Sequence, residues 1–140
     1  MVMLAVDSPA LCRSVRNDGR DCSAEMATID RQIDAAYAMQ DFVDSQCGGR
    51  GLGWYRIVKT PTQARHAIRN GRLAVVLGIE TSHLFYCNST GTCDWRSGLK
   101  RYLDRGVRHF FPIHQDDNAF GGASYFQPWI QRQGNWLAIR

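Results

Sequence analysis

The sequence predicts a single α/β domain built around a parallel sheet. Residues 73–79 are apolar at every position, which is typical of a strand covered on both faces, as in a parallel sheet flanked by helices. Helical and strand patterns alternate along the chain with short links, which is the order found in α/β proteins. The 140 residues have about the length of one average domain and contain no linker, so we expect one unit over residues 1–140.

Residues 1–22 show no clear periodicity, and we predict no regular element there. From Ser23 onward, apolar residues recur at steps of three and four, which predicts an amphipathic helix capped by Ser23 and ended by Gly48 and Gly49. A short β-prone run follows at residues 54–58. The predicted inward face of the helix consists of Met26, Ile29, Ile33, Tyr37, Phe42 and Val43.

The next predicted helix has signals at both ends. Thr60 is expected to cap it, Pro61 to occupy its first position and Gln63 to reach back to the cap. Asn70 and Gly71 supply a left-handed stop. The apolar face of this helix consists of Ala64, Ala67 and Ile68.

Two predicted strands are each followed by a residue that can do chemistry. The strand 73–79 ends in Glu80, and a helix at 97–105 leads into a strand at 107–113 that ends in His114. Because ligands gather at the carboxyl ends of parallel strands, Glu80 and His114 are candidates for metal ligation or acid–base work. The alternatives are that Glu80 caps a neighbouring helix and that His114 makes a structural hydrogen bond. The helix 97–105 should turn Leu99, Tyr102 and Leu103 inward.

Charge and hydropathy exclude several classes of partner. The net charge is +4, but the basic residues are scattered rather than arranged in a stripe, so we expect no nucleic acid as partner. No apolar run approaches the roughly 18 residues that a transmembrane helix needs. The start of the chain lacks the basic residues of a secretory signal, and the cellular compartment stays open.

The five cysteines are an odd number without a C-x-x-C pair, which argues against a structural zinc site. Cys87 and Cys93 flank the polar, turn-prone residues 88–92, so a local disulfide is feasible if the compartment is oxidising. Two free thiols beside a loop are the alternative.

A set of residues between Lys59 and Gly122 resembles the membrane (renal-type) dipeptidase family of amidohydrolase-like metallo-hydrolases. Residues 117–121, which read Asp-Asn-Ala-Phe-Gly, stand where that family has an Asn-rich, Gly-containing loop. The matching residues are Thr60-Pro61, Ala64, Ala67-Ile68, Gly71-Arg72-Leu73-Ala74-Val75-Val76-Leu77-Gly78-Ile79-Glu80, Leu103, Gly106-Val107-Arg108 and Ile113-His114.

The resemblance implies a (β/α)8 barrel of the TIM type with two zinc ions at its C-terminal rim, which hydrolyses dipeptides or related amides. In that family the glutamate at the position of Glu80 bridges the two ions. The histidine at the position of His114 lies by the substrate and stabilises the oxyanion that forms, so the resemblance makes it the catalytic residue. By the same resemblance His114, Asp117 and Asn118 are expected to bind the peptide substrate.

Three departures from the family shape the expectation. Thr81 and Ser82 replace the two glycines that usually follow the bridging glutamate, and no upstream His-x-Asp metal pair is present. A complete barrel typically needs about 250 residues. We therefore expect the 140 residues to be an internal piece of a longer protein, inactive alone and prone to associate through open sheet edges.

Two other interpretations are kept. His114-Gln115-Asp116 is itself a His-x-Asp after a strand, so that strand could be the family's first one. The second interpretation is a metal-free barrel that binds a ligand or a partner, since a fold does not fix a function.

Overall fold

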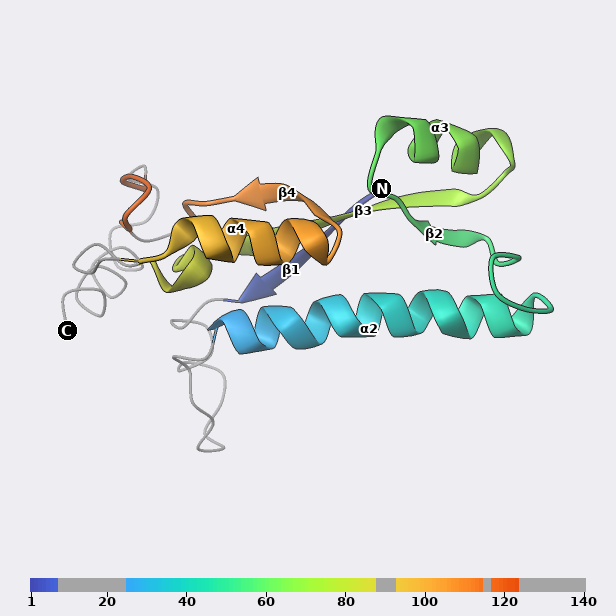
Figure 1. Ribbon diagram of the computed structural model, residues 1–140, viewed down its shortest axis with the longest axis horizontal. Helices are drawn as coiled ribbons and strands as arrows, with labels where there is room; N and C mark the ends of the chain where they lie inside the picture. Colours follow the sequence, from blue (N-terminus) through green and yellow to red (C-terminus); the bar gives the residue numbers. More distant parts are fainter. Residues whose placement is uncertain (8–24, 88–92, 115–116, 124–140) are drawn as a thin grey trace.

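The computed structural model of the chain describes residues 1–7, 25–87, 93–114 and 117–123. These residues form a mixed α/β structure in which helices flank a parallel sheet, as the sequence predicts (Figure 1). In chain order the elements are β1 (Val2–Asp7), α2 (Glu25–Gln46), β2 (Tyr55–Ile57), α3 (Pro61–Arg69), β3 (Leu73–Thr81), the 3-10 turn η1 (Leu84–Tyr86), α4 (Trp95–Asp104) and β4 (Val107–Phe111).

The sheet has four strands, and all of its strand pairs are parallel. β3 lies at the centre, with β1 along one side, where Asp7 is in register with Thr81. The other side of β3 is shared: β2 pairs with its first three residues and β4 with its second half. The sheet is therefore open, and no closed barrel is formed by the residues that the structure describes.

β1 corrects the prediction that residues 1–22 hold no regular element. Its pairing with β3 joins residues far apart in the sequence: the Met1 ammonium donates to the Ala74 carbonyl at 2.8 Å, and the Met1 carbonyl accepts from Val76 N at 2.9 Å. A strand of six residues without alternation carries no period of its own. Its partner strand, which a local pattern does not reveal, determines its structure.

Helices cover both faces of the sheet. Successive side chains of a strand point to opposite faces, so the residues of β3 divide into two sets. The odd-numbered set packs with buried residues of α2 and α4, and the even-numbered set packs with α3. The first core contains Val75, Leu77 and Ile79 with Ile29, Ile33 and Tyr102, and the second contains Ala74 with Val58 and Ala67.

α2 is amphipathic as predicted, with Ile29 and Ile33 buried, and the chain leaves it through a turn where Gly48 and Gly49 have positive φ. Phe42 is the exception, since 59% of it is exposed. It follows Ile33 by nine residues, which at 3.6 residues per turn places it on the opposite side of the helix. The residues expected to cap the start of the helix lie outside the described ranges.

The end signals of α3 are confirmed. Thr60 Oγ1 accepts from Gln63 N at 3.2 Å, and Gly71 takes φ +67° after the helix. The Gln63 side chain reaches one residue further than expected, because its Oε1 accepts from Lys59 N at 2.7 Å. Ile68 was expected on the buried face but is 63% exposed. α3 covers only the first half of β3, and Ala67 is its buried contact with that half.

α4 begins earlier than predicted, at Trp95, because Asp94 caps it by accepting from Ser97 N at 3.1 Å. Tyr102 is buried and donates its hydroxyl to Asp30 Oδ1 of α2 at 2.9 Å. Burial and this carboxylate raise the pKa of Tyr102. Leu103, expected to point inward, is instead 37% exposed.

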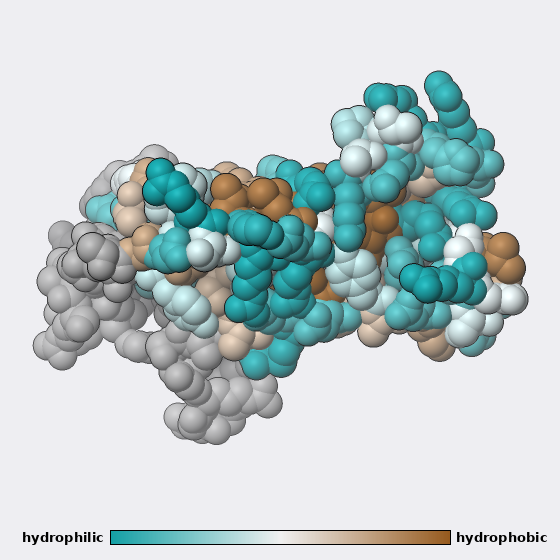
Figure 2. Space-filling view, viewed as in Figure 1, coloured by the Kyte–Doolittle hydropathy of each residue, from teal (hydrophilic) through white to brown (hydrophobic). Residues whose placement is uncertain are grey.

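β4 is shorter and less covered than predicted. It ends at Phe111 rather than at residue 113, and Val107 is its only fully buried residue. Phe111 is 46% exposed, and Figure 2 shows an apolar area over this part of the sheet. β4 contains the exposed polar residues Arg108 and His109 and, among the described residues, pairs with β3 alone. None of the helices that the structure describes has the length and apolar character required to cross a bilayer.

Candidate functional site

The two residues that the strand ends single out meet in the structure. His114 Nδ1 lies 2.6 Å from Glu80 Oε1, close enough for a hydrogen bond. Glu80 is the penultimate residue of β3, and His114 follows the end of β4, which pairs with β3 up to Glu80. Both side chains are about one-fifth exposed, so the pair is partly desolvated but open to a small ligand. The contact also fits the alternative in which His114 makes a structural hydrogen bond, so both interpretations of His114 stay open.

A buried carboxylate that sequence reasoning missed holds the segment next to Glu80. Glu25, the first residue of α2, is 1% exposed, and its Oε2 accepts from Thr81 Oγ1 and from His83 N, each at 3.1 Å. His83 Nδ1 lies 3.3 Å from the same oxygen. Because α2 brings this anchor from 56 residues away in sequence, only the acidic residue at the helix start could have hinted at it.

Two buried oxygen atoms beside this anchor have no hydrogen-bond partner within the described ranges. They are Oε1 of Glu25 and Oγ of Ser82. Ser82 stands where the resembled family has a glycine, so this departure places a hydroxyl between Glu80 and His83 in the chain.

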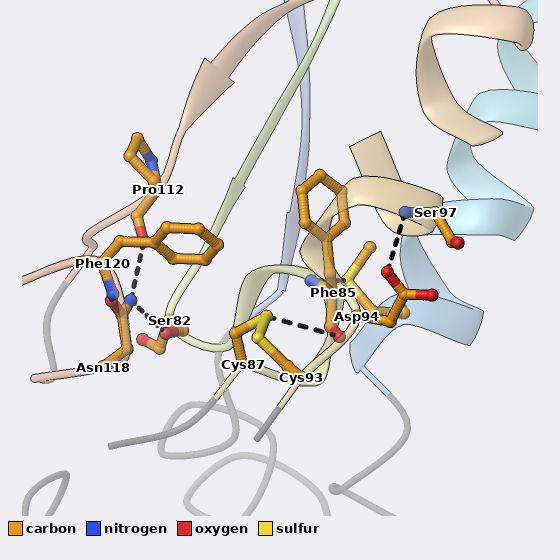
Figure 3. Close-up of a disulfide and its surroundings, with 10 residues drawn as sticks. Ser82, Phe85, Cys87, Cys93, Asp94, Ser97, Pro112, Asn118 and Phe120 are labelled. Carbon is orange, nitrogen blue, oxygen red and sulfur yellow. Dashed lines mark hydrogen bonds between the residues drawn. A yellow bond between two sulfur atoms is a disulfide. The ribbon is translucent and has the colours of Figure 1, made fainter. Parts of the chain in front are cut away.

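Asn118, expected at the substrate, is bound to the backbone around the site (Figure 3). Its Nδ2 donates to the carbonyl oxygens of Ser82 at 2.8 Å and of Pro112 at 2.6 Å, and its Oδ1 accepts from Phe120 N at 2.8 Å. It is 7% exposed. These contacts use both amide hydrogens and an oxygen lone pair, so in this structure Asn118 shapes the site.

Asp117, in the same loop, also accepts a hydrogen bond from the backbone. Its Oδ1 accepts from Ala123 N at 2.8 Å, which closes the turn that contains Gly121 and Gly122. Asp117 is partly exposed, in contrast to Asn118. In the alternative His-x-Asp motif at residues 114–116, Gln115 and Asp116 lie outside the described ranges.

Cys87 and Cys93 form a disulfide, with a Cα–Cα distance of 5.1 Å (Figure 3). It links the residue after η1 to the residue before the Asp94 cap of α4. The loop 88–92 lies outside the described residues. Cys47 is an exposed free thiol.

The turn η1 between Glu80 and this disulfide is strained. Phe85 and Tyr86 have φ of 59° and 61°, in the left-handed region that side chains disfavour. The ring of Phe85 stacks on Tyr102 at 5.8 Å and meets Phe110 edge-on at 5.9 Å. Such a conformation persists only where the surroundings determine it, and here packing and the disulfide do so.

The donors of the site fit zinc by type but not by number. A carboxylate oxygen and an imidazole nitrogen are both zinc ligands, and a catalytic zinc typically has three protein ligands. Within the described residues no group of three or more His, Cys, Asp or Glu side chains comes together.

Comparison with known proteins adds no relative. No family model matches the chain, and neither a curated protein nor a solved structure matches it.

Proposed function

We propose that this chain is part of a metal-dependent dipeptidase or related amidohydrolase, with Glu80 and His114 at the catalytic rim. The observation that supports the proposal is the 2.6 Å contact between His114 Nδ1 and Glu80 Oε1 at the carboxyl ends of two paired parallel strands. Catalytic residues of α/β barrels come from this end of several strands. The family resemblance over residues 59–122 selects these two positions independently of the contact.

We propose a (β/α)8 barrel as the context of the site. Within the described residues, β1 and β4 pair with β3 alone, so each leaves one edge for a further strand. The side chain of Ile79 faces α2 and α4, which would lie outside the barrel. Because successive side chains of a strand point to opposite faces, the side chain of Glu80 lies on the face that would form the interior of the barrel. α3 packs on that face beside Ala74 and Val76, whereas a closed barrel carries its helices on the outside.

Two zinc ions in such a site would supply a nucleophilic hydroxide and polarise the peptide carbonyl. Glu80 offers one carboxylate, and the remaining ligands would come from residues outside those described here. His114 would act on the substrate: the contact of Nδ1 with Glu80 fixes the orientation of the ring and leaves Nε2 for the substrate. A donor held in this way stabilises an oxyanion without having to reorganise during the reaction.

The proposal is tested on the protein expressed from its gene with everything that flanks the 140 residues. Zinc content and dipeptide hydrolysis are measured for the wild type, for Glu80→Gln and for Asp41→Asn, an exposed carboxylate on α2 that serves as the matched control. We expect Glu80→Gln to lose zinc and activity, because a carboxamide cannot bridge two cations as a carboxylate does. Unchanged zinc and activity in Glu80→Gln would contradict the proposal.

The same measurement separates the alternative function. A protein that folds and binds small molecules, yet neither retains zinc nor hydrolyses dipeptides, would be the metal-free binding module. In that case Glu80→Gln and Asp41→Asn should behave alike.

A further inference from the structure

A second site lies between β2 and α3, on the part of the sheet furthest from Glu80. The structure has a cavity of about 550 Å³ there, within the range of small-molecule pockets. Four of its lining residues are basic and none is acidic; the basic ones are Arg56, Lys59, His66 and Arg72. Figure 2 shows apolar surface with hydrophilic surroundings between α2 and α3, where β2 lies in Figure 1.

The floor of the cavity is apolar and firmly packed. Val58 and Ala67 line it and belong to the core between α3 and β3, where each is 4% exposed. A ligand in this cavity would therefore contact apolar side chains at its base and positive charge around them.

The two arginines are held in place by their own partners. Arg56 forms an ion pair with the buried Asp44 and also donates to the Gly53 carbonyl. Arg72 donates a hydrogen bond from one guanidinium nitrogen to the Gly51 carbonyl oxygen at 2.9 Å. Each guanidinium has five N–H donors, so these contacts orient both groups and leave donors for a ligand.

The charge around the cavity is not balanced within the described part of the chain. Asp44 neutralises Arg56, but no ion pair is formed there by Arg72 or Lys59. Burial, and after it the positive charge of Arg72, lower the pKa of Arg56. An anion between them would relieve this repulsion.

This cavity is separate from the Glu80–His114 pair. Arg72 precedes β3, and Glu80 lies eight residues later, which corresponds to about 26 Å along an extended strand. A single small molecule cannot occupy both places.

We propose that the cavity between β2 and α3 binds an organic oxyanion, a phosphate or carboxylate group carried on a small apolar body. Guanidinium groups match both oxyanions with paired hydrogen bonds, and the floor at Val58 and Ala67 accommodates the apolar part. The site is independent of the proposed hydrolase activity.

The test uses the 140-residue chain and isothermal titration with phenyl phosphate, benzoate and inorganic phosphate. The variants are Arg72→Gln and Lys59→Gln. Arg65→Gln is the matched control, because it removes one exposed positive charge from α3 without touching the cavity. Lys59 is exposed, so its replacement should leave the fold intact, which circular dichroism checks.

We expect phenyl phosphate or benzoate, or both, to bind saturably and more tightly than inorganic phosphate. Arg72→Gln and Lys59→Gln should each weaken binding by at least about tenfold, the size of one lost hydrogen bond to a charged group. The phosphate and carboxylate probes then identify which headgroup the site prefers. Absence of saturable binding, or equal weakening by Arg65→Gln, would overturn the proposal, as would inorganic phosphate binding as tightly as phenyl phosphate.

Discussion

Asn118 donates an amide hydrogen to the carbonyl oxygen of Ser82 at 2.8 Å and so ties the segment after β4 to the segment after β3 (Figure 3). Its other donation, to Pro112 at 2.6 Å, holds the backbone two residues before His114. Asn118 thus holds the backbone near both Glu80 and His114, and its amide nitrogen hydrogen-bonds to the backbone of Ser82 and Pro112.

We expect Asn118→Ala to lower the free energy of unfolding by about 1–3 kcal/mol, because it removes the donors to the buried carbonyl oxygen of Ser82 and the partly buried one of Pro112. Asn118→Asp should cost at least as much, since a carboxylate cannot donate to Ser82 and Pro112. Urea denaturation measures both variants. A midpoint that stays at the wild-type value in Asn118→Ala would mean that water replaces the lost contacts.

His114→Ala tests the role of the histidine in the whole protein. If His114 contacts the developing oxyanion, its loss should lower kcat by roughly two orders of magnitude or more, as removal of one oxyanion contact does, with metal retained. His109→Ala is the control, because His109 is exposed within β4. Loss of metal from His114→Ala would instead make His114 a ligand and favour the His-x-Asp interpretation of residues 114–116.

Local sequence signals predicted the elements whose boundaries are set by residues next to them in the sequence. Thr60 and Gly71 bound α3 as expected, because a cap and a left-handed stop act within one turn of the helix. β1 was missed, because its structure depends on hydrogen bonds to Ala74 and Val76, more than 70 residues away. Leu103 was misplaced, since hydrophobicity alone does not show which side of a helix has a neighbour.

The candidate site follows the same division. Glu80 and His114 were predictable, because each directly follows an apolar run and parallel strands bring their carboxyl ends together. Glu25 was not, because a carboxylate at a helix start is common and only the folded chain shows it buried against Thr81 and His83.

The cap of α4 should be sensitive to acid. Hydrogen bonds from Ser97 to the Asp94 carboxylate, aided by the charge of Arg96, lower the pKa of Asp94 in the folded protein. A group with a lowered pKa contributes stability above its unfolded pKa of about 3.9, and this contribution is lost as the pH falls through the folded value. We expect the cap to weaken below about pH 4.

Asp94→Asn isolates this effect, because asparagine caps a helix without titrating. At pH 6 the free energy of unfolding should be larger for the wild type than for Asp94→Asn, because the Asp94 charge interacts favourably with the helix dipole. This difference should shrink as the pH falls. Because both proteins are compared at each pH, the contributions of the other carboxylates to the pH dependence cancel. A difference that is constant between pH 6 and pH 2 would contradict the role given to the charge.

The Cys87–Cys93 disulfide is expected to stabilise the rim. It closes a loop with a sequence separation of 6, for which chain entropy predicts about 2 kcal/mol of stabilisation. We therefore expect Cys93→Ser to lower the free energy of unfolding by about 2 kcal/mol under oxidising conditions. The loss should be local at first, because the bond ends at the strained turn of Phe85 and at the cap of α4.

Cys47→Ser is the matched control for this experiment, since Cys47 is exposed and its change should stay within about 0.5 kcal/mol. Under reducing conditions the wild type should fall to the stability of Cys93→Ser, because both then lack the cross-link. Counting thiols on the denatured, oxidised protein checks the bond directly. Five free thiols, or equal stability of the wild type and Cys93→Ser before reduction, would show that the bond is not formed in solution and that packing around Phe85 alone holds the turn.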